Sequence, residues 1–398
     1  MEAVRISNRI KAMAPSATLA MSQKSSELRA AGVDVINLSV GEPDFDTPQH
    51  IKDAAKKAID DNITRYPPVP GFPALRKAIA EKLHKENGLG YTPEQIVVSA
   101  GAKHSLYNAI LAMVNPGDEV VIPMPAWVSY VEMVKLAEGT VVPVEAGIDQ
   151  NFKVTPAQLE AAITPRTSMV LLCSPSNPSG SVYSREELRG LVDVLARHPH
   201  VAVLSDEIYE HINYTGSFTS LGSFPEIADR VVIVNGVSKA YAMTGWRMGY
   251  VCAPQPVIAA MTKLHQFGIM SAPTTSQYAA IEAMRSGDED IAHMREEYDS
   301  RRRYLVENLN RIGLDCFEPK GAFYVFPCIR SSGLSSDEFC ERFLREEKVA
   351  VIPGTAFGPG GEGYVRACYA SSMRDLTESI SRLDNFLQNL RRKQGQDG

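Results

Sequence analysis

The sequence predicts an α/β fold built on a mostly parallel β-sheet. Short apolar runs typical of buried strands alternate with amphipathic stretches typical of helices, and this alternation favours parallel strands joined by crossover helices. Polar side chains follow directly after several of the apolar runs, at the strand ends where open α/β sheets bind ligands. With 398 residues, the chain is long enough for one large domain and one smaller domain.

Composition narrows the class of protein further. The formal net charge of -6 argues against nucleic acid or an anionic membrane surface as the main partner. No apolar run reaches the roughly 18 residues of a membrane span, and the first residues lack the apolar core of a leader peptide. The 6 cysteines are scattered without a Cys-x-x-Cys pair, which indicates reduced thiols and predicts no metal site. We expect a cytoplasmic protein.

The N-terminal part contains two loops between predicted helices and strands. The expected elements are a helix at 16–31, a strand at 35–40, and helices at 49–61 and 75–87. Prolines and glycines in 41–48 and 65–71 exclude helix there and predict ordered, extended loops.

The middle of the chain carries the predicted sheet. Strands are expected at 96–99, 120–123, 169–173, 201–204 and 231–234, and helices at 104–114 and 185–197. Small residues at 101–102 separate the first of these strands from its helix, and backbone N–H groups at such a helix start suit a phosphate.

The pattern changes near residue 284. We expect a long charged helix at 289–312, an aromatic strand at 321–326, a helix at 336–346, strands at 349–352 and 364–369 around the glycine-rich loop 354–363, and a final helix at 373–391.

Lys239 and Arg247 are the residues around which the middle segment is organised. Lys239 follows the predicted strand 231–234, and a lysine held between buried segments tends toward the nucleophilic neutral amine. Such an amine can form a Schiff base with a carbonyl cofactor, and an arginine nearby could hold a phosphate. The alternative is a surface lysine and a structural arginine.

The segment from Ser238 to Tyr250, SKAYAMTGWRMGY, resembles the cofactor-lysine motif of class I aminotransferases, which are enzymes of fold type I that depend on pyridoxal phosphate (PLP). The resemblance extends from about Ile6 to about Leu390. It implies a large domain at 48–288, with a mostly parallel seven-stranded sheet flanked by helices, and a smaller α/β domain formed by 1–47 and 289–398. It also implies a homodimer with shared active sites.

The resemblance assigns cofactor roles to the polar residues at the strand ends. It implies that Lys239 carries PLP and later acts as the base, and that Asp206 pairs with the pyridine nitrogen. Tyr209 and Asn177 are expected to hydrogen-bond the phenolic oxygen, and Trp127 to stack on the ring. The residues expected to hold the phosphate are Gly101, Ala102, Lys103, Ser238, Arg247 and the partner's Tyr66.

The same resemblance predicts how a substrate is held. Arg366, which interrupts an apolar run, matches the arginine that binds the substrate α-carboxylate through two hydrogen bonds. Taken alone, Arg366 would be a charge on an edge strand. The backbone of Gly41 is expected to help bind that carboxylate, and Trp127 and Asn177 are expected to contact the substrate.

Three residues point to a dicarboxylic substrate. Lys103, Ser16 and Thr18 resemble the bacterial-type aspartate aminotransferase branch, in which residues at these places contact the distal carboxylate. The alternative for Lys103 is a solvated lysine beside the phosphate turn. The predicted reaction is therefore the conversion of aspartate and 2-oxoglutarate to oxaloacetate and glutamate.

The chain departs from the family pattern at three positions. It has Gly236 where a serine is frequent, Ala126 where an aromatic is usual, and Ala14 where relatives that use prephenate often have a lysine. The missing lysine argues against prephenate, and the missing aromatic predicts a more open pocket wall.

The C-terminal half resembles other branches. The segments 265–267 and 271–277 are similar to aromatic or N-acetyl-diaminopimelate aminotransferases, so these activities remain alternatives. A PLP-dependent C–S β-lyase shares the fold and the lysine, and is a further alternative. A PLP-binding regulatory protein would need a basic DNA-binding module, and the N-terminal residues supply none.

Overall fold

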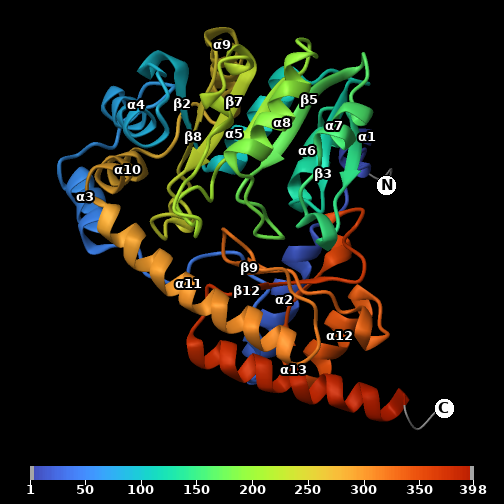
Figure 1. Ribbon diagram of the computed structural model, residues 1–398. Coiled ribbons are helices and arrows are strands. Elements are labelled where there is room, and N and C mark those ends of the chain that lie inside the picture. The colour runs from blue at the N-terminus through green and yellow to red at the C-terminus, as the bar shows by residue number, and fades with distance from the viewer. Residues whose placement is uncertain (1–3, 395–398) are drawn as a thin grey trace.

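The computed structural model describes residues 4–394 and is dominated by a seven-stranded sheet with the strand order β2-β8-β7-β6-β5-β3-β4 (Figure 1). Its strands are β2 (Ile96–Ser99), β3 (Glu119–Met124), β4 (Thr140–Glu145), β5 (Thr167–Cys173), β6 (Ala202–Asp206), β7 (Val231–Gly236) and β8 (Gly249–Cys252). Only β8 runs antiparallel to its neighbours, β2 and β7. The predicted fold class, α/β with a mostly parallel sheet, is confirmed.

Helices cover both faces of this sheet because its strands are apolar on both sides. In β7, Val231 and Ile233 join one core cluster, whereas Val232 and Val234 join another. The first face is covered by α3 (Gln49–Asp60), α4 (Pro73–Asn87), α7 (Pro156–Ala162), α8 (Arg185–Ala196) and α10 (Thr274–Ser286). The second is covered by α5 (Ala102–Met113), α6 (Val128–Leu136) and α9 (Gln255–Gly268).

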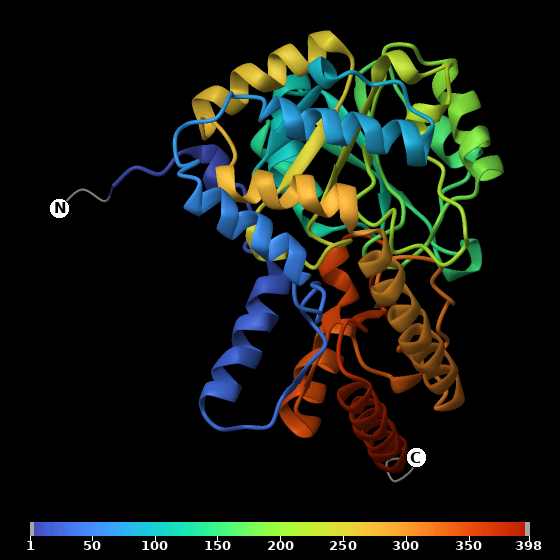
Figure 2. The same ribbon diagram turned by 90° about the vertical axis from the view of Figure 1, so that its left-hand side faces the viewer.

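A second group of elements combines both ends of the chain. It contains α2 (Ala17–Ala30), β1 (Ile36–Asn37), α11 (Asp288–Arg311), β9 (Tyr324–Val325), α12 (Ser336–Glu347), β10 (Val349–Ala350), β11 (Ile352–Pro353), β12 (Val365–Cys368) and α13 (Met373–Gln394). β1 pairs with β10 in parallel, and Figure 2 shows α2 below the large sheet beside the C-terminal elements. The remaining short helix, α1 (Asn8–Lys11), precedes α2. The domain limits at 48 and 289 remain a prediction.

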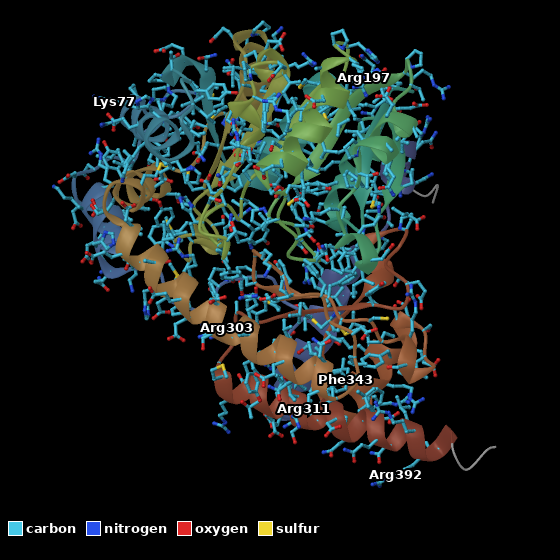
Figure 3. The ribbon with its side chains drawn as sticks, viewed as in Figure 1. Lys77, Arg197, Arg303, Arg311, Phe343 and Arg392 are labelled. Carbon is cyan, nitrogen blue, oxygen red and sulfur yellow. The ribbon has the colours of Figure 1, made fainter. Side chains whose placement is uncertain are left out.

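The C-terminal elements have their own aromatic core. Phe343 of α12 is buried, and its ring centroid lies 5.8 Å from that of Phe339 and 5.4 Å from that of Phe386. Figure 3 labels Phe343 among these C-terminal elements, Arg303 on α11 and Lys77 on α4, and the last two side chains are exposed. Within residues 4–394, no helix combines the length and the hydrophobicity needed to cross a bilayer.

Most predicted elements agree with the structure to within a few residues, and the main difference is at 349–352. This predicted strand is split into β10 and β11, because β10 pairs with β1 whereas β11 pairs with β12. The helix predicted at 104–114 begins at Ala102, directly after Gly101. The sequence did not single out β4, α6, α7, α9 or α10.

Candidate active site

A cavity of about 280 Å³ lies where the carboxyl ends of the parallel strands face the C-terminal elements. The predicted site residues that line it are Gly41, Ala102, Lys103, Trp127, Asn177, Asp206, Tyr209, Ser238, Lys239, Arg247 and Arg366. The strand ends therefore bring together residues that are up to 325 positions apart, from Gly41 to Arg366.

Lys239 lies in the turn that follows β7, inside this cavity. Its Nζ donates a hydrogen bond to the backbone oxygen of Gly41 at 2.6 Å. Burial lowers the pKa of the Lys239 amine to about 8, and the charges of Arg366 and Arg247 act in the same direction. A larger fraction of this amine than of an ordinary lysine is therefore neutral, and nucleophilic, near neutral pH.

Asp206 lies at the end of β6 and is buried. Its Oδ2 accepts a hydrogen bond from the hydroxyl of Tyr130 at 2.6 Å, and its Oδ1 accepts one from the backbone N–H of Ile208 at 3.2 Å. Burial raises the pKa of the Asp206 carboxyl to about 6, although both hydrogen bonds act against that rise. A cation placed against this carboxyl would favour its charged form.

This buried carboxyl predicts a stabilising mutation, Asp206→Asn, in the cofactor-free protein. The pKa of Asp206 is about 6 in the folded protein and 3.8 ordinarily. The protonated carboxyl therefore contributes fully to the stability of the fold below pH 3.8, and this contribution is lost as the pH rises through 6. At about 1.4 kcal/mol per pH unit, the difference of 2.2 corresponds to at most ~3 kcal/mol. The amide of the variant does not ionise, so its thermal midpoint should exceed that of the wild type at pH 8 and converge with it at pH 4.

The control for this comparison is Asp60→Asn, an exposed aspartate at the end of α3. Its midpoint should follow the wild type at both pH values. A midpoint for Asp206→Asn that is equal to or below the wild type at pH 8 would contradict the account of this buried acid.

Groups that suit an anion lie at the start of α5. Gly101 has a φ of +88°, and a Cβ at this position would lie 2.5 Å from Nη2 of Arg247, so glycine lets the guanidinium approach the turn. Ala102, at the first helical position, lines the cavity together with Arg247 and Ser238. Free N–H groups at a helix start, an arginine and a hydroxyl form a suitable site for a phosphate.

Arg366 is buried in β12, the middle strand of the three-stranded sheet β11-β12-β9, and is not a charge on an edge strand. Its Nη1 donates to Oδ1 of Asn177 at 3.0 Å, and its Nη2 donates to the backbone oxygen of Ser39 at 2.6 Å. The guanidinium carbon lies 4.5 Å from the ring centroid of Tyr324. Among residues 4–394, Nε has no hydrogen-bond partner and no carboxylate pairs with this arginine, which suits a substrate carboxylate.

Two tyrosines that sequence reasoning missed shape the same site. Tyr130, the partner of Asp206, lies three residues after Trp127 in α6, a helical spacing that could have indicated a shared face. The hydroxyl of Tyr324 lies 2.7 Å from the hydroxyl of Tyr209. A Cβ on Gly41 would lie 2.3 Å from that Tyr324 hydroxyl, so a side chain at 41 would displace Tyr324.

Lys103 lies between this cavity and a second one. Its Nζ is 4.7 Å from the ring centroid of Trp127, and burial, together with the charge of Arg247, lowers the pKa of its ammonium. The second cavity, of about 660 Å³, shares Lys103 and Arg247 with the first and is also lined by Ala14, Ser16 and Ala126.

Four predicted site residues do not line the first cavity, and one of them, Gly101, directly precedes Ala102, which does. Tyr66 is 85% exposed, so its predicted role depends on a second subunit. Ser16 accepts a hydrogen bond from the backbone N–H of Leu19 at the start of α2 and reaches only the second cavity. Thr18 belongs to α2, and its side chain lies outside the part of the chain that the structure describes.

Comparison with known proteins identifies relatives over almost the whole chain. Residues 33–383 match the family described as "Aminotransferase class I and II". The chain is 47% identical over 394 residues to an aspartate/prephenate aminotransferase of Cereibacter sphaeroides, which covers 96% of this chain and 98% of the relative.

Two solved structures show the same fold. The aspartate aminotransferase of Thermus thermophilus with maleate has a TM-score of 0.93 and 42% identity, over 96% of this chain and 100% of that chain. The aromatic aminotransferase of Pyrococcus horikoshii has a TM-score of 0.87 and 42% identity, over 92% of this chain and 99% of that chain.

Proposed function

The chain belongs to the class I and II aminotransferases, PLP-dependent enzymes that act on amino acids and 2-oxo acids, and we propose that it converts aspartate and 2-oxoglutarate to oxaloacetate and glutamate. The observation that carries this substrate choice is the set of cations in the cavity. Lys103, Lys239, Arg247 and Arg366 line it, and within residues 4–394 none forms an ion pair with a carboxylate.

Three of these four residues match anionic groups of the reactants, whereas Lys239 reacts with the cofactor aldehyde as a neutral amine. Arg247 suits the cofactor phosphate, Lys239 the cofactor aldehyde, and Arg366 the substrate α-carboxylate. Lys103 is left for a second carboxylate on the substrate side chain. Its ammonium is already partly desolvated, so an ion pair with that carboxylate would be stronger than one in open water.

The donor set fits PLP. When bound, PLP supplies an aldehyde that bonds amino groups and a ring that accepts electrons from the substrate Cα. Lys239 would hold the aldehyde carbon, Asp206 the ring nitrogen, and Trp127 the ring face. Tyr209 and Asn177 would donate to the phenolic oxygen. The phosphate would lie against the backbone of the turn formed by Gly101, Ala102 and Lys103, and against the side chains of Ser238 and Arg247.

The protein's own groups divide the work of proton transfer and orientation. Nζ of Lys239, once released, takes the proton from the substrate Cα, and its pKa of about 8 suits a base near neutral pH better than the ordinary value of 10.5 does. Arg366 orients the α-carboxylate, and Asn177 and Ser39 hold the guanidinium in place. Charged Asp206 stabilises a protonated ring nitrogen.

The lowered pKa of Lys239 predicts how cofactor binding depends on pH. Only the neutral amine attacks an aldehyde, so the rate at which the cofactor-free protein bonds PLP should rise with pH and level off above about 8. Stopped-flow absorbance after mixing with PLP measures this rate. Free Nα-acetyl-lysine, which keeps its ε-amine, is the control, and its rate of reaction with PLP should still rise near pH 10. The same midpoint for both amines would contradict a desolvated Lys239.

Lys103→Ala tests the substrate choice. Loss of a charge-assisted hydrogen bond worth about 1.5–3 kcal/mol should lower kcat/KM for aspartate and glutamate by ~10- to 100-fold, and for phenylalanine by less than ~3-fold. Lys135→Ala removes a lysine at the end of α6 that pairs with Glu132, and serves as the control with no change. Equal losses of kcat/KM for all three substrates would show that Lys103 does not determine substrate specificity.

Aromatic substrates are the second candidate, favoured by the second cavity. Ala126 stands where the family usually has an aromatic residue, and it lines this space of about 660 Å³ beside Lys103. A ring on the substrate side chain could enter there. The likeness to the Pyrococcus horikoshii aromatic aminotransferase supports this alternative, and the aspartate/prephenate relative keeps prephenate open although Ala14 replaces the lysine.

A homodimer with shared active sites belongs to the same proposal. Tyr66 and Phe267 are 85% and 83% exposed, large aromatic surfaces that a second copy would cover. In such a dimer the partner's Tyr66 would reach the phosphate bound at Arg247.

A further inference from the structure

A buried ion pair lies behind the active-site cavity, between the turn after β6 and α4. The side chains of Glu210 and Lys82 are each 4% exposed, and Nζ of Lys82 donates a hydrogen bond to Oε1 of Glu210. Charges are rarely placed so deep without a partner, and each of these two groups stabilises the charged form of the other. None of the proposed catalytic roles uses this pair.

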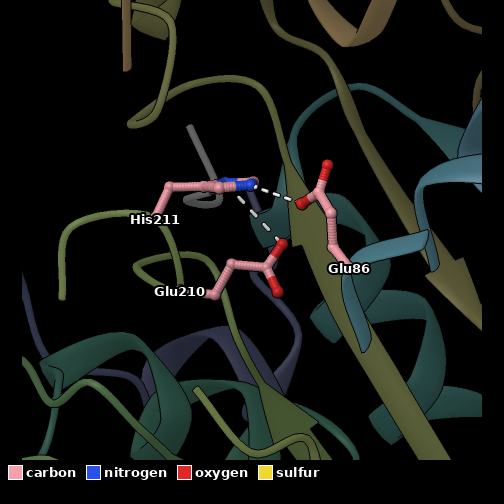
Figure 4. Close-up of side chains that lie close together, drawn as sticks. All are labelled: Glu86, Glu210 and His211. Carbon is pink, nitrogen blue, oxygen red and sulfur yellow. Dashed lines mark hydrogen bonds and ion pairs between the residues drawn. The ribbon is translucent and has the colours of Figure 1, made fainter. Parts of the chain in front are cut away.

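The same cluster resembles a metal site, but a cation is already in place. Figure 4 shows Glu86, Glu210 and His211, whose ligand atoms lie within 4.8 Å of one another. Nε2 of His211 lies 2.8 Å from Glu86, and Nδ1 lies 3.7 Å from Glu210. The ammonium of Lys82 bonds Glu210 and lies 3.6 Å from Oε2 of Glu86. The ammonium of Lys82 therefore already supplies a positive charge to two of these three groups.

Glu210 also connects the two turns that carry the proposed catalytic groups. It follows Tyr209 directly and lies four positions after Asp206. Its Oε1 accepts a hydrogen bond from Nδ2 of Asn235 at 3.0 Å, at the end of β7 and four positions before Lys239. Oδ1 of Asn235 accepts from the backbone N–H of Gly236 at 2.7 Å, which fixes the amide of Asn235.

The carboxylate of Glu210 is suited to act as a permanent acceptor. Burial alone would raise the pKa of Glu210, but the charges of Lys82 and His211 and the hydrogen bonds from Lys82 and Asn87 lower it to about 2. The neighbouring Glu207 behaves differently, because burial and the charge of Glu210 raise its pKa to about 7. Glu210 is therefore fully charged at neutral pH.

We propose that Glu210 is a positioning residue for transamination: through Asn235 it fixes the turn that carries Lys239 relative to the turn that carries Asp206 and Tyr209. Lys82 keeps this acceptor charged and buried. The inference rests on the catalytic roles proposed for Lys239, Asp206 and Tyr209. Displacing a reacting group by about 1 Å can cost ~100-fold in rate, so a hydrogen bond that sets the distance between the two turns affects kcat.

A matched pair of double variants tests whether Glu210 acts as a hydrogen-bond acceptor, for Asn235 and also for Asn87. Lys82→Met with Glu210→Gln removes both charges but keeps an oxygen that accepts from Asn235. Lys82→Met with Glu210→Leu removes the charges and the acceptor together. Neither variant leaves an unpaired buried charge, so both can fold, and thermal unfolding checks this. The readouts are kcat, KM, and the pH midpoint of the absorbance band of the lysine-linked cofactor.

The variant with Lys82→Met and Glu210→Gln should keep kcat within ~3-fold of the wild type, and the pH midpoint of its absorbance band should not change. The variant with Lys82→Met and Glu210→Leu, here called the leucine pair, should lose ~10- to 100-fold in kcat. Its KM should stay within ~3-fold of the wild type, and the pH midpoint of its absorbance band should move. Asn235→Ala, which keeps the ion pair, should lose kcat in the same way and replaces the leucine pair if that variant does not fold. Wild-type kcat and midpoint in the leucine pair or in Asn235→Ala would overturn the positioning role alone. A wild-type protein without transamination or a cofactor band would overturn the proposed function as well.

Discussion

Lys239→Ala is expected to abolish transamination, with a loss of at least ~10⁴-fold in kcat, while the protein remains folded. The variant loses the amine that bonds the cofactor and the base that moves the proton at the substrate Cα, and positioned base catalysis alone contributes ~10²–10⁴-fold. Its Nζ makes a single hydrogen bond, to Gly41, in the described part of the chain, so little packing is lost. Coupled assays of oxaloacetate formation measure the rate, and circular dichroism measures the fold.

Lys263→Ala is the matched control, because Lys263 lies on the exposed side of α9. It should retain the wild-type rate and the wild-type cofactor absorbance. Near-normal turnover in Lys239→Ala would refute the assignment of the catalytic lysine, whatever its effect on stability.

Arg366→Ala should lower kcat/KM by about 10³-fold for every amino acid that the enzyme accepts. The guanidinium is expected to make two charge-assisted hydrogen bonds to the α-carboxylate, each worth about 1.5–3 kcal/mol, and this carboxylate is common to all the substrates. Steady-state kinetics with aspartate, glutamate and phenylalanine measure the loss. Arg366→Lys should recover only a part of it, because an ammonium cannot reproduce the planar fork that Asn177 and Ser39 hold in place.

Arg366→Ala and Lys103→Ala should differ with phenylalanine, because only Arg366→Ala is expected to impair that substrate strongly. A loss confined to aspartate and glutamate in Arg366→Ala would exchange the proposed roles of the two cations. Loss of cofactor absorbance in Arg366→Ala would mean that the arginine supports the cofactor site instead of the substrate.

The parts of the fold that depend on local pattern could be predicted from the sequence. The run Ile96–Ser99 is buried on both faces of a sheet, and its apolar residues indicate a strand with the observed bounds. The strand 349–352 could not be predicted as two pieces, because the break depends on pairing β10 with β1, more than 300 residues earlier in the chain. Pairing partners leave no signal in local hydrophobicity.

The candidate site also has a part that the sequence could predict and a part that depends on long-range contacts. Asp206 and Lys239 follow apolar strands directly, so their place at one edge of the sheet follows from the topology of parallel strands. The contacts of Tyr130 with Asp206 and of Tyr324 with Tyr209 depend on side chains that meet across 76 and 115 positions. Sequence reasoning alone could not find these partners, because tyrosine is an ordinary core residue.

A single half-reaction tests the proposed transamination of aspartate and glutamate: the PLP form is mixed with one amino acid and the absorbance of the lysine-linked cofactor is followed. We expect aspartate and glutamate to remove this absorbance rapidly, with oxaloacetate or 2-oxoglutarate appearing in equal amount, and phenylalanine to react much more slowly. Rapid reaction with phenylalanine or an acylated diamino acid alone would contradict the dicarboxylic assignment. No reaction with any of these amino acids, together with release of a thiol, ammonia and pyruvate from an amino acid that carries sulfur on Cβ, would contradict transamination and indicate a lyase.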